Sequence, residues 1–150
     1  MRSLVLPTVV FLPAMVFVLV GLETGCAVVD PWESRRAELS EGAEDCGRLA
    51  PRTECDDSGQ QAARCLLDAW SACQRATLET TRTTIEGDPI VGLLAIEPSD
   101  DGCRVVQLID TRADDFGPRE VTESVCAQLV EEDAAFRGCP FVVAEDCTRR

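Results

Sequence analysis

The clearest periodic pattern in the chain begins just after Ser58. The run GQQAARCLLDAWSACQRA repeats apolar side chains every three or four residues, which is the period of a helix with one buried face. Asp57 or Ser58 can cap its first turn. The apolar stripe consists of Ala62, Cys65, Leu66, Ala69, Trp70 and Cys73. We therefore predict an amphipathic helix held at both ends by its cysteines, with Trp70 in the core.

After this helix the pattern becomes typical of strands. Runs rich in Thr, Val and Ile predict four strands, at 76–86, 90–97, 103–110 and 119–129. The turns GDP and PSDDG and the loop TRADDFGP separate them. The expected fold class is α+β, with one helix packed on a roughly four-stranded antiparallel meander and stabilised by disulfides. The tail from Glu131 is either one more edge strand or a disulfide-closed loop.

The start of the chain has the pattern of an export signal. Arg2 is followed by 19 uncharged residues, 4–22, and then by Glu23, Thr24, Gly25 and Cys26. The Thr24-Gly25-Cys26 triplet resembles the lipobox of bacterial lipoproteins, although Glu23 stands where Leu is usual. The resemblance implies a lipid on Cys26. Two alternatives are an uncleaved anchor, since 19 apolar residues can span a bilayer, and cleavage without lipidation.

The residues after the signal are polar, and they suggest three parts to the chain. We expect a signal peptide over 1–25, a flexible tether over 26–45 and a cysteine-rich α+β domain over 46–150. A short helix from Trp32 to Leu39 is an alternative within the tether. The stretch 46–57 is expected to be a loop, because Gly47 and Pro51 interrupt it.

The cysteine count supports lipidation. Nine cysteines cannot all pair, but eight can form four disulfides once Cys26 carries lipid. No C-x-x-C pair is present, which argues against zinc ribbons and thioredoxin-like sites. Eight cysteines allow 105 connectivities, among which we favour a Cys139–Cys147 pair. The expected disulfide cysteines are Cys46, Cys55, Cys65, Cys73, Cys103, Cys126, Cys139 and Cys147.

Composition limits the chemistry available to the chain. All 14 basic residues are Arg, and Lys, His, Tyr and Asn are absent, so triads and dyads that need His or Lys cannot form. The net charge of −13 disfavours binding to nucleic acid. There is no G-x-S-x-G motif and no phosphate-binding loop. We expect no cofactor and no enzymatic activity.

Acidic residues provide two weaker candidates for function. Asp110, Asp114 and Asp115 are the candidate calcium ligands, because acids at alternating loop positions can bind calcium through oxygen. Arg112 stands where an EF-hand needs an acid. An acid-type hydrolase would need two carboxylates across a cleft, a requirement that some pair among 27 acids can always meet.

The stretches CLLDAWSAC, TTIEGDPI and DDGCRVV give the chain a resemblance to uncharacterised small, cysteine-rich exported lipoproteins of GC-rich bacteria. This resemblance implies a non-enzymatic binding or structural module anchored to the bacterial cell envelope, on its periplasmic or outer-membrane face. The expected partners are the membrane, through a lipid on Cys26, and an envelope protein.

Overall fold

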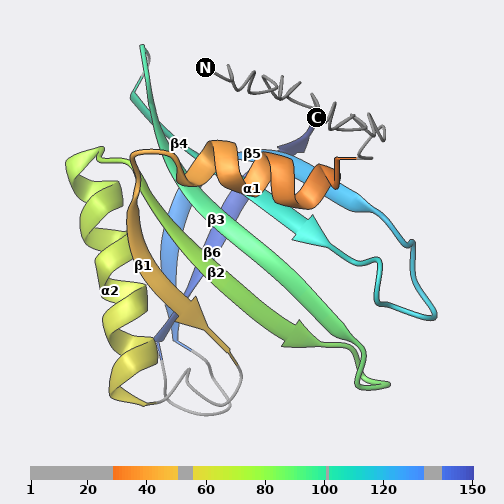
Figure 1. Ribbon diagram of the computed structural model, residues 1–150. Helices are drawn as coiled ribbons and strands as arrows, with labels where there is room; N and C mark the ends of the chain where they lie inside the picture. The colour runs from red at the N-terminus through yellow and green to blue at the C-terminus, as the bar shows by residue number, and fades with distance from the viewer. Residues whose placement is uncertain (1–28, 51–55, 101, 134–139) are drawn as a thin grey trace, which may run out of the picture.

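The described residues form two helices and one six-stranded sheet (Figure 1). The computed structural model describes residues 29–50, 56–100, 102–133 and 140–150. In chain order the elements are α1 (Pro31–Ser40), β1 (Glu44–Leu49), α2 (Asp57–Ala72), β2 (Ala76–Thr83), β3 (Pro89–Ser99), β4 (Gly102–Asp110), β5 (Val121–Asp133) and β6 (Pro140–Arg149). The predicted α+β class is confirmed. The prediction of four strands and one helix was too low, because the described residues contain six strands and two helices.

The strands lie in the sheet in sequence order. β2 to β5 form the four-stranded antiparallel meander that the sequence predicted, and β6 extends it as the edge strand that was one alternative for the tail; β1 pairs with β2 in parallel. Two parallel neighbours need a long crossover between them, and α2 provides it. The loop predicted over 46–57 is therefore wrong for Cys46–Leu49, which belongs to β1. Part of that stretch, 51–55, lies outside the described residues.

The predicted amphipathic helix is confirmed as α2, and its buried stripe faces one side of the sheet. Leu66 is fully buried, and Ala62 and Ala69 lie beside it. The cap is Asp56 rather than Asp57 or Ser58, and its carboxylate accepts a hydrogen bond from the Gly59 amide at 2.9 Å. Cys73, at φ 52°, ends the helix in the left-handed conformation.

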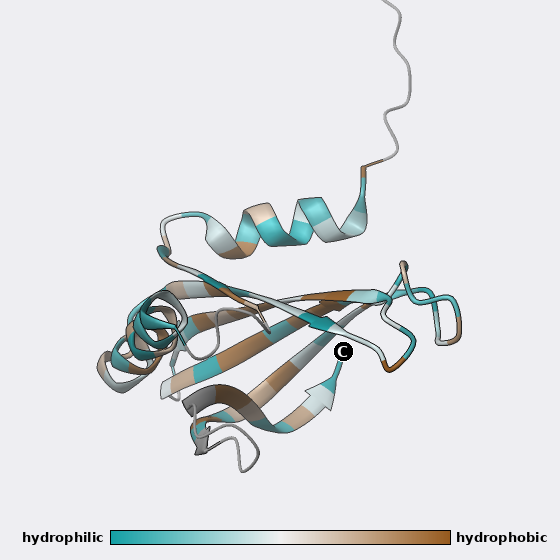
Figure 2. Ribbon diagram, turned by 90° about the horizontal axis from the view of Figure 1, so that it is seen from below, coloured by the Kyte–Doolittle hydropathy of each residue, from teal (hydrophilic) through white to brown (hydrophobic). Residues whose placement is uncertain are grey.

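The opposite side of the sheet is covered by α1 (Figure 2). Asp30 caps this helix, and Pro31 occupies its first turn. Trp32 and Leu39 are buried against a second apolar cluster of Leu93, Ala95, Val106 and Leu108. The flexible tether expected over 26–45 is therefore wrong from Asp30 onward, because two apolar side chains fix this segment to the sheet. The alternative helix from Trp32 to Leu39 is confirmed.

The far end of the sheet folds back across the side that carries α2. β5 pairs with β4 over Val121–Cys126, whereas β5 and β6 continue to pair as far as Asp133 and Pro140. Leu129 of β5 and Val142 of β6 are buried in the same apolar cluster as α2. The strongly curled sheet in Figure 2 thus encloses its core between β2–β4, α2 and the returning β5–β6 hairpin.

Three disulfides among the described residues stabilise this arrangement. They join Cys46 of β1 to Cys65 of α2, Cys73 at the end of α2 to Cys103 of β4, and Cys126 of β5 to Cys147 of β6. Cys147 therefore pairs with Cys126, and the Cys139–Cys147 pair favoured from the sequence is wrong. Cys26, Cys55 and Cys139 lie outside the described residues. Neither of the two described helices is long and apolar enough to cross a membrane.

Candidate functional site

The acidic loop between β4 and β5 was the candidate calcium site, but its three acids do not converge. Asp110 accepts two side-chain hydrogen bonds from Arg112, at 2.9 and 2.6 Å, and this interaction lowers the pKa of its carboxyl. Asp114 accepts hydrogen bonds from the backbone amides of Phe116 and Gly117. Asp115 pairs with Arg119. Each carboxylate therefore stabilises the loop itself.

Contacts to other elements also hold this loop in place. Arg112 reaches the N-cap residue of α1, Asp30, at 2.9 Å. The amide of Asp115 donates to the carboxylate of Asp88, in the β2–β3 turn, at 3.0 Å. Within the described ranges, no group of three or more His, Cys, Asp or Glu side chains is placed to hold a metal ion. The sequence-predicted calcium ligands are thus brought near one another without forming a shared oxygen cage.

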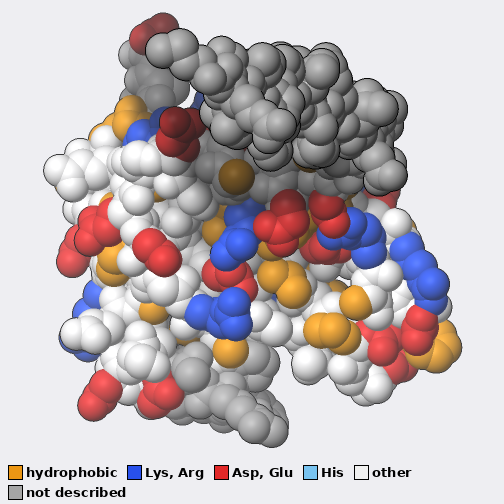
Figure 3. Space-filling view, viewed as in Figure 1, with side chains coloured by type: hydrophobic (Ala, Val, Ile, Leu, Met, Phe, Trp, Pro, Cys, Tyr) orange, Lys and Arg blue, Asp and Glu red, His pale blue; other side chains and the backbone are white. Residues whose placement is uncertain are grey.

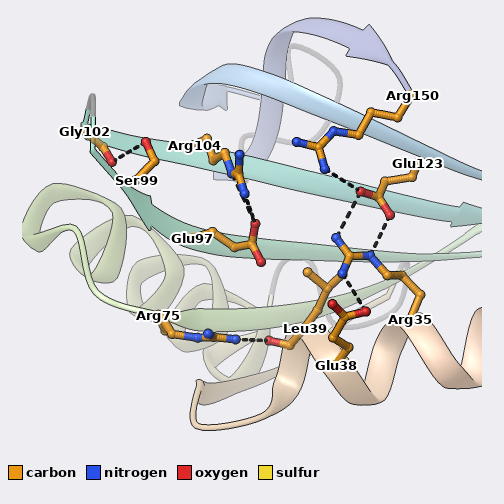
Figure 4. A network of polar contacts seen from close by, with 10 residues as sticks. All are labelled: Arg35, Glu38, Leu39, Arg75, Glu97, Ser99, Gly102, Arg104, Glu123 and Arg150. Carbon is orange, nitrogen blue, oxygen red and sulfur yellow. Dashed lines mark hydrogen bonds and ion pairs between the residues drawn. The ribbon is translucent and has the colours of Figure 1, made fainter.

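Three largely buried carboxylates lie on the face that carries α1, and each contacts an arginine. Glu79, Glu97 and Glu123 have side chains 15–19% exposed. Glu79 pairs with Arg36 and Arg48. Figure 4 shows the other two sets, in which Glu97 pairs with Arg104 and Glu123 with Arg35 and Arg150. Figure 3 shows acidic and basic side chains lying side by side on the face that carries α1.

Ion pairing of this kind is unsuited to acid catalysis. A general acid that acts near neutral pH needs a raised carboxyl pKa. Four described carboxyls have a lowered pKa instead, because each accepts hydrogen bonds that stabilise its charged form. They are Asp30, Asp56, Asp110 and Glu123. Three of the described ion pairs, Arg35–Glu123, Arg36–Glu79 and Arg112–Asp30, link α1 or its cap residue to the sheet and to the loop after β4.

A polar hollow of about 620 Å³ lies between α1 and the β1–β2 edge. Its charged lining includes Glu33, Arg36, Arg48 and Glu79. Arg36 pairs with both Glu33 and Glu79, and Arg48 also pairs with Glu79. Asp45, the fifth charged residue of the lining, has no ion pair with another described residue and accepts a hydrogen bond from the Gly47 amide at 2.8 Å. The hollow therefore holds three acids against two arginines, and both arginines are already paired.

A different cavity lies where the β5–β6 hairpin folds back over the sheet, and we refer to it as the β6 groove. Its volume is about 350 Å³, which is within the range of small-molecule sites. Its described lining comprises Thr80 and Arg82 of β2, Ile90, Gly92, Leu93 and Leu94 of β3, Gln107 and Ile109 of β4, Thr111 just after β4, and Val142, Val143 and Ala144 of β6.

The β6 groove is apolar at its inner end. Leu94 and Val142 line it there, and they also belong to the cluster buried by α2. Ile90 and Ile109 are only partly buried, so their side chains leave apolar surface on the groove wall. Because α2 already covers the neighbouring part of the same face, the groove is the portion of that face without a helix above it. An apolar molecule placed there would remove this surface from water.

Gly92 has no side chain, and this leaves space in the groove above β3. Gly92 lies directly opposite Thr80 on β2 and Ile109 on β4. A Cβ added at Gly92 would lie 2.4 Å from the Thr80 hydroxyl oxygen, far inside normal contact distance. The Thr80 side chain thus occupies the space that a larger residue at 92 would need. A side chain at that position would also project from the face that lines the groove.

The groove was not identified from the sequence, although its parts were assigned to strands. Gly92, inside a strand otherwise rich in Val, Ile and Leu, was the available signal, because such a glycine often marks a close approach. Cys26, the expected lipid site, lies outside the described residues. Comparisons with known protein families, with curated proteins and with solved structures found no match.

Proposed function

We propose that this protein is an exported, lipid-anchored binding module whose β6 groove takes an apolar or amphipathic small molecule. The observation that carries the proposal is the groove itself, a cavity of about 350 Å³ with an apolar inner end on an otherwise covered sheet face. Cavities of this size, lined mainly by apolar groups with a few polar ones, are the usual form of a small-molecule site.

The disulfides indicate the compartment in which the module works. Three bridges among the described cysteines indicate an oxidising, extracytoplasmic environment. Six of the nine cysteines are then paired, and Cys26, Cys55 and Cys139 remain. Three is an odd number, so at least one of them lies outside any intramolecular disulfide. A lipid on Cys26 would account for this, and it agrees with the lipobox-like triplet.

Anchoring at Cys26 would hold the whole domain close to a membrane. The segment from Cys26 to Pro31 spans at most about 18 Å when fully extended, and α1 begins at Pro31 with its apolar residues on the sheet. This short connection sets how far α1 can lie from the bilayer. The groove lies on the opposite face of the sheet, so an amphiphile would reach it around the edge of the domain.

The proposal is tested by probe binding with a matched pair of variants. The exported chain carrying Cys26→Ser behind a cleavable signal keeps every described element and needs no detergent. Titration with the fluorescent apolar probe N-phenylnaphthylamine should show saturable binding. Thr80→Phe, which fills the groove, should weaken binding at least about tenfold, since it excludes the probe from several apolar contacts.

The control is Thr83→Phe, an exposed position on the same strand whose side chain points to the opposite face. It should bind the probe as the parent does. Ala144→Leu, which narrows the groove from the β6 side, gives a second test if Thr80→Phe unfolds. Absence of saturable binding by the parent, or equal binding by the folded groove variants, would refute the proposed function.

A further inference from the structure

Arg82 lines the β6 groove without a protein partner. Across the described ranges it alone among the arginines has no hydrogen bond or ion pair; the others contact carboxylates, a glutamine or a backbone carbonyl. The chain carries 27 acids against 14 arginines, so acids are in excess. An arginine left unpaired in such a chain is available to a ligand.

Along one face of β2, the side chains change from apolar at its start to positively charged at Arg82. Leu78, Thr80 and Arg82 are two residues apart, so their side chains project to the same side of β2. Leu78 is fully buried beneath α2, Thr80 borders the groove, and Arg82 is exposed opposite Ile90. About 13 Å of strand separates Leu78 from Arg82. The groove therefore has an apolar inner end and a positively charged rim.

The polar groups around this rim match an anion better than a cation. None of the described lining residues is acidic. The side chains of Gln107 and Thr80 make no hydrogen bond to other described residues, so they are available as further donors. A guanidinium binds a carboxylate or a phosphate through two parallel hydrogen bonds. A cationic head group would instead meet Arg82 without a compensating carboxylate.

We propose that the β6 groove binds a single-chain amphiphile with an anionic head, a carboxylate or a phosphate, whose head pairs with Arg82 and whose chain lies toward Leu94 and Val142. This inference rests on the proposed function and adds the class of ligand and the residue that selects it. The chain is accommodated by the apolar inner end, and the head stays at the exposed rim, where water can still reach it.

The rim lies at the end of the sheet that exposes the largest apolar side chains. Ile85, in the β2–β3 turn that follows Arg82, is fully exposed, and Phe116, in the β4–β5 loop, is 78% exposed. The hydrogen bond from the Asp115 amide to Asp88 joins that loop to that turn. Both exposed apolar side chains thus lie on the turn and the loop at the end of the sheet where Arg82 is found.

The test compares three ligands that share a ten-carbon alkyl chain and differ in the head: undecanoate, decyl phosphate and decanol. Each competes against N-phenylnaphthylamine on the Cys26→Ser chain. Undecanoate or decyl phosphate should bind about tenfold more tightly than decanol, the increment expected of a charge-assisted hydrogen-bonded pair at a partly exposed site. The stronger of the two anions identifies the head group.

Arg82→Gln should remove this preference, leaving the three ligands within about twofold of one another while decanol binds unchanged. Arg64→Gln, an exposed arginine on α2 far from the groove lining, is the matched control and should keep the preference. Equal binding of all three ligands by the parent, or an undiminished preference in Arg82→Gln, would overturn the inference while leaving the proposed function standing. If none of the ligands binds and the probe does not bind either, the proposed function fails instead.

Discussion

Arg35 of α1 and Glu123 of β5 form a two-point contact, in which the guanidinium donates to both carboxylate oxygens at 2.7 and 3.1 Å (Figure 4). Both side chains are about one-fifth exposed. The pair joins a helix near the start of the described chain to a strand near its end. It fixes the orientation of α1, because two parallel hydrogen bonds define a plane as well as a distance.

This contact predicts a specific response to acid. The Arg35 guanidinium lowers the pKa of Glu123 below its ordinary value of 4.5. The contribution of Glu123 to stability is therefore complete above pH 4.5 and is lost as the pH falls through the lowered pKa of the folded state. Thermal unfolding of the parent should lose more stability on acidification below pH 4.5 than that of Glu123→Gln. Parallel pH profiles for the two proteins would contradict this role.

Truncating the apolar anchor of α1 should release the helix. Trp32 is 6% exposed and is the largest side chain of α1 on the sheet. Trp32→Ala should lower the free energy of unfolding by about 3 kcal/mol, or detach α1 locally if the sheet survives. Amide hydrogen exchange should then accelerate across 31–40 more than in β2–β4. Val29→Ala, at a 68% exposed position, should change neither quantity. Unchanged protection of α1 in Trp32→Ala would show that Trp32 does not hold the helix, and rapid exchange across 31–40 already in the parent would restore the tether interpretation.

The sequence predicted α2 and β2–β4 well and predicted α1 and β1 poorly, and the difference has a physical cause. α2 carries six apolar residues at helical spacing, and β2–β4 carry runs of β-branched side chains, so both patterns are local. In α1 only Trp32 and Leu39 are buried, seven residues apart among charges, and that is too few for a convincing period. β1 contains Gly47, at φ 90°, and pairs in parallel with a strand beyond α2, which no local pattern can reveal.

The groove was inaccessible to sequence reasoning for the same reason. Arg82, Gly92 and Val142 come from three strands, and they meet only because β5 and β6 fold back over the sheet. Disulfide pairing is equally non-local, so Cys126–Cys147 could not be chosen among the alternatives. Asp114 and Asp115 were correctly placed in a connector and Asp110 at the end of the strand before it. Their partners, Arg112 and Arg119 for Asp110 and Asp115 and two backbone amides for Asp114, could be recognised only in the folded chain.

Gly92 and Thr80 should be energetically coupled. Gly92→Ala should destabilise the protein by about 1–3 kcal/mol, because the new methyl group would meet the Thr80 hydroxyl at 2.4 Å. In a Thr80→Ala background the hydroxyl is absent, and the same substitution should cost little or become favourable, since Ala has less backbone entropy to lose than Gly. Urea unfolding of the four proteins gives the coupling energy. Additive effects would exclude the close contact.

The bridge between β5 and β6 should support both stability and the groove. Replacing Cys126 and Cys147 together by Ala should lower the unfolding free energy by about 2–4 kcal/mol and weaken probe binding, because Val142 and Ala144 of β6 form one wall. Replacing Cys46 and Cys65 together provides the comparison, since it removes a bridge between elements that do not line the groove. If both double variants lose probe binding equally at matched stability, the Cys126–Cys147 bridge does not position the β6 wall of the groove.

The length of the ligand chain should matter up to the capacity of the groove. Each methylene buried in an apolar site contributes about 0.8 kcal/mol, so decanoate should bind roughly tenfold more tightly than octanoate. The increment should shrink for longer acids once the inner end near Leu94 is full. Competition titrations across the series measure it. An affinity independent of chain length would mean that the chain remains in water.

Amide chemical-shift mapping during a titration with decanoate tests the central claim most directly, because it reports where the ligand lies. The claim predicts saturable shifts at Arg82, Gly92, Ile109 and Val143, around the β6 groove, with α1 on the opposite face unaffected. Shifts confined to α1 and the β1–β2 edge, or no saturable shifts at all, would contradict it.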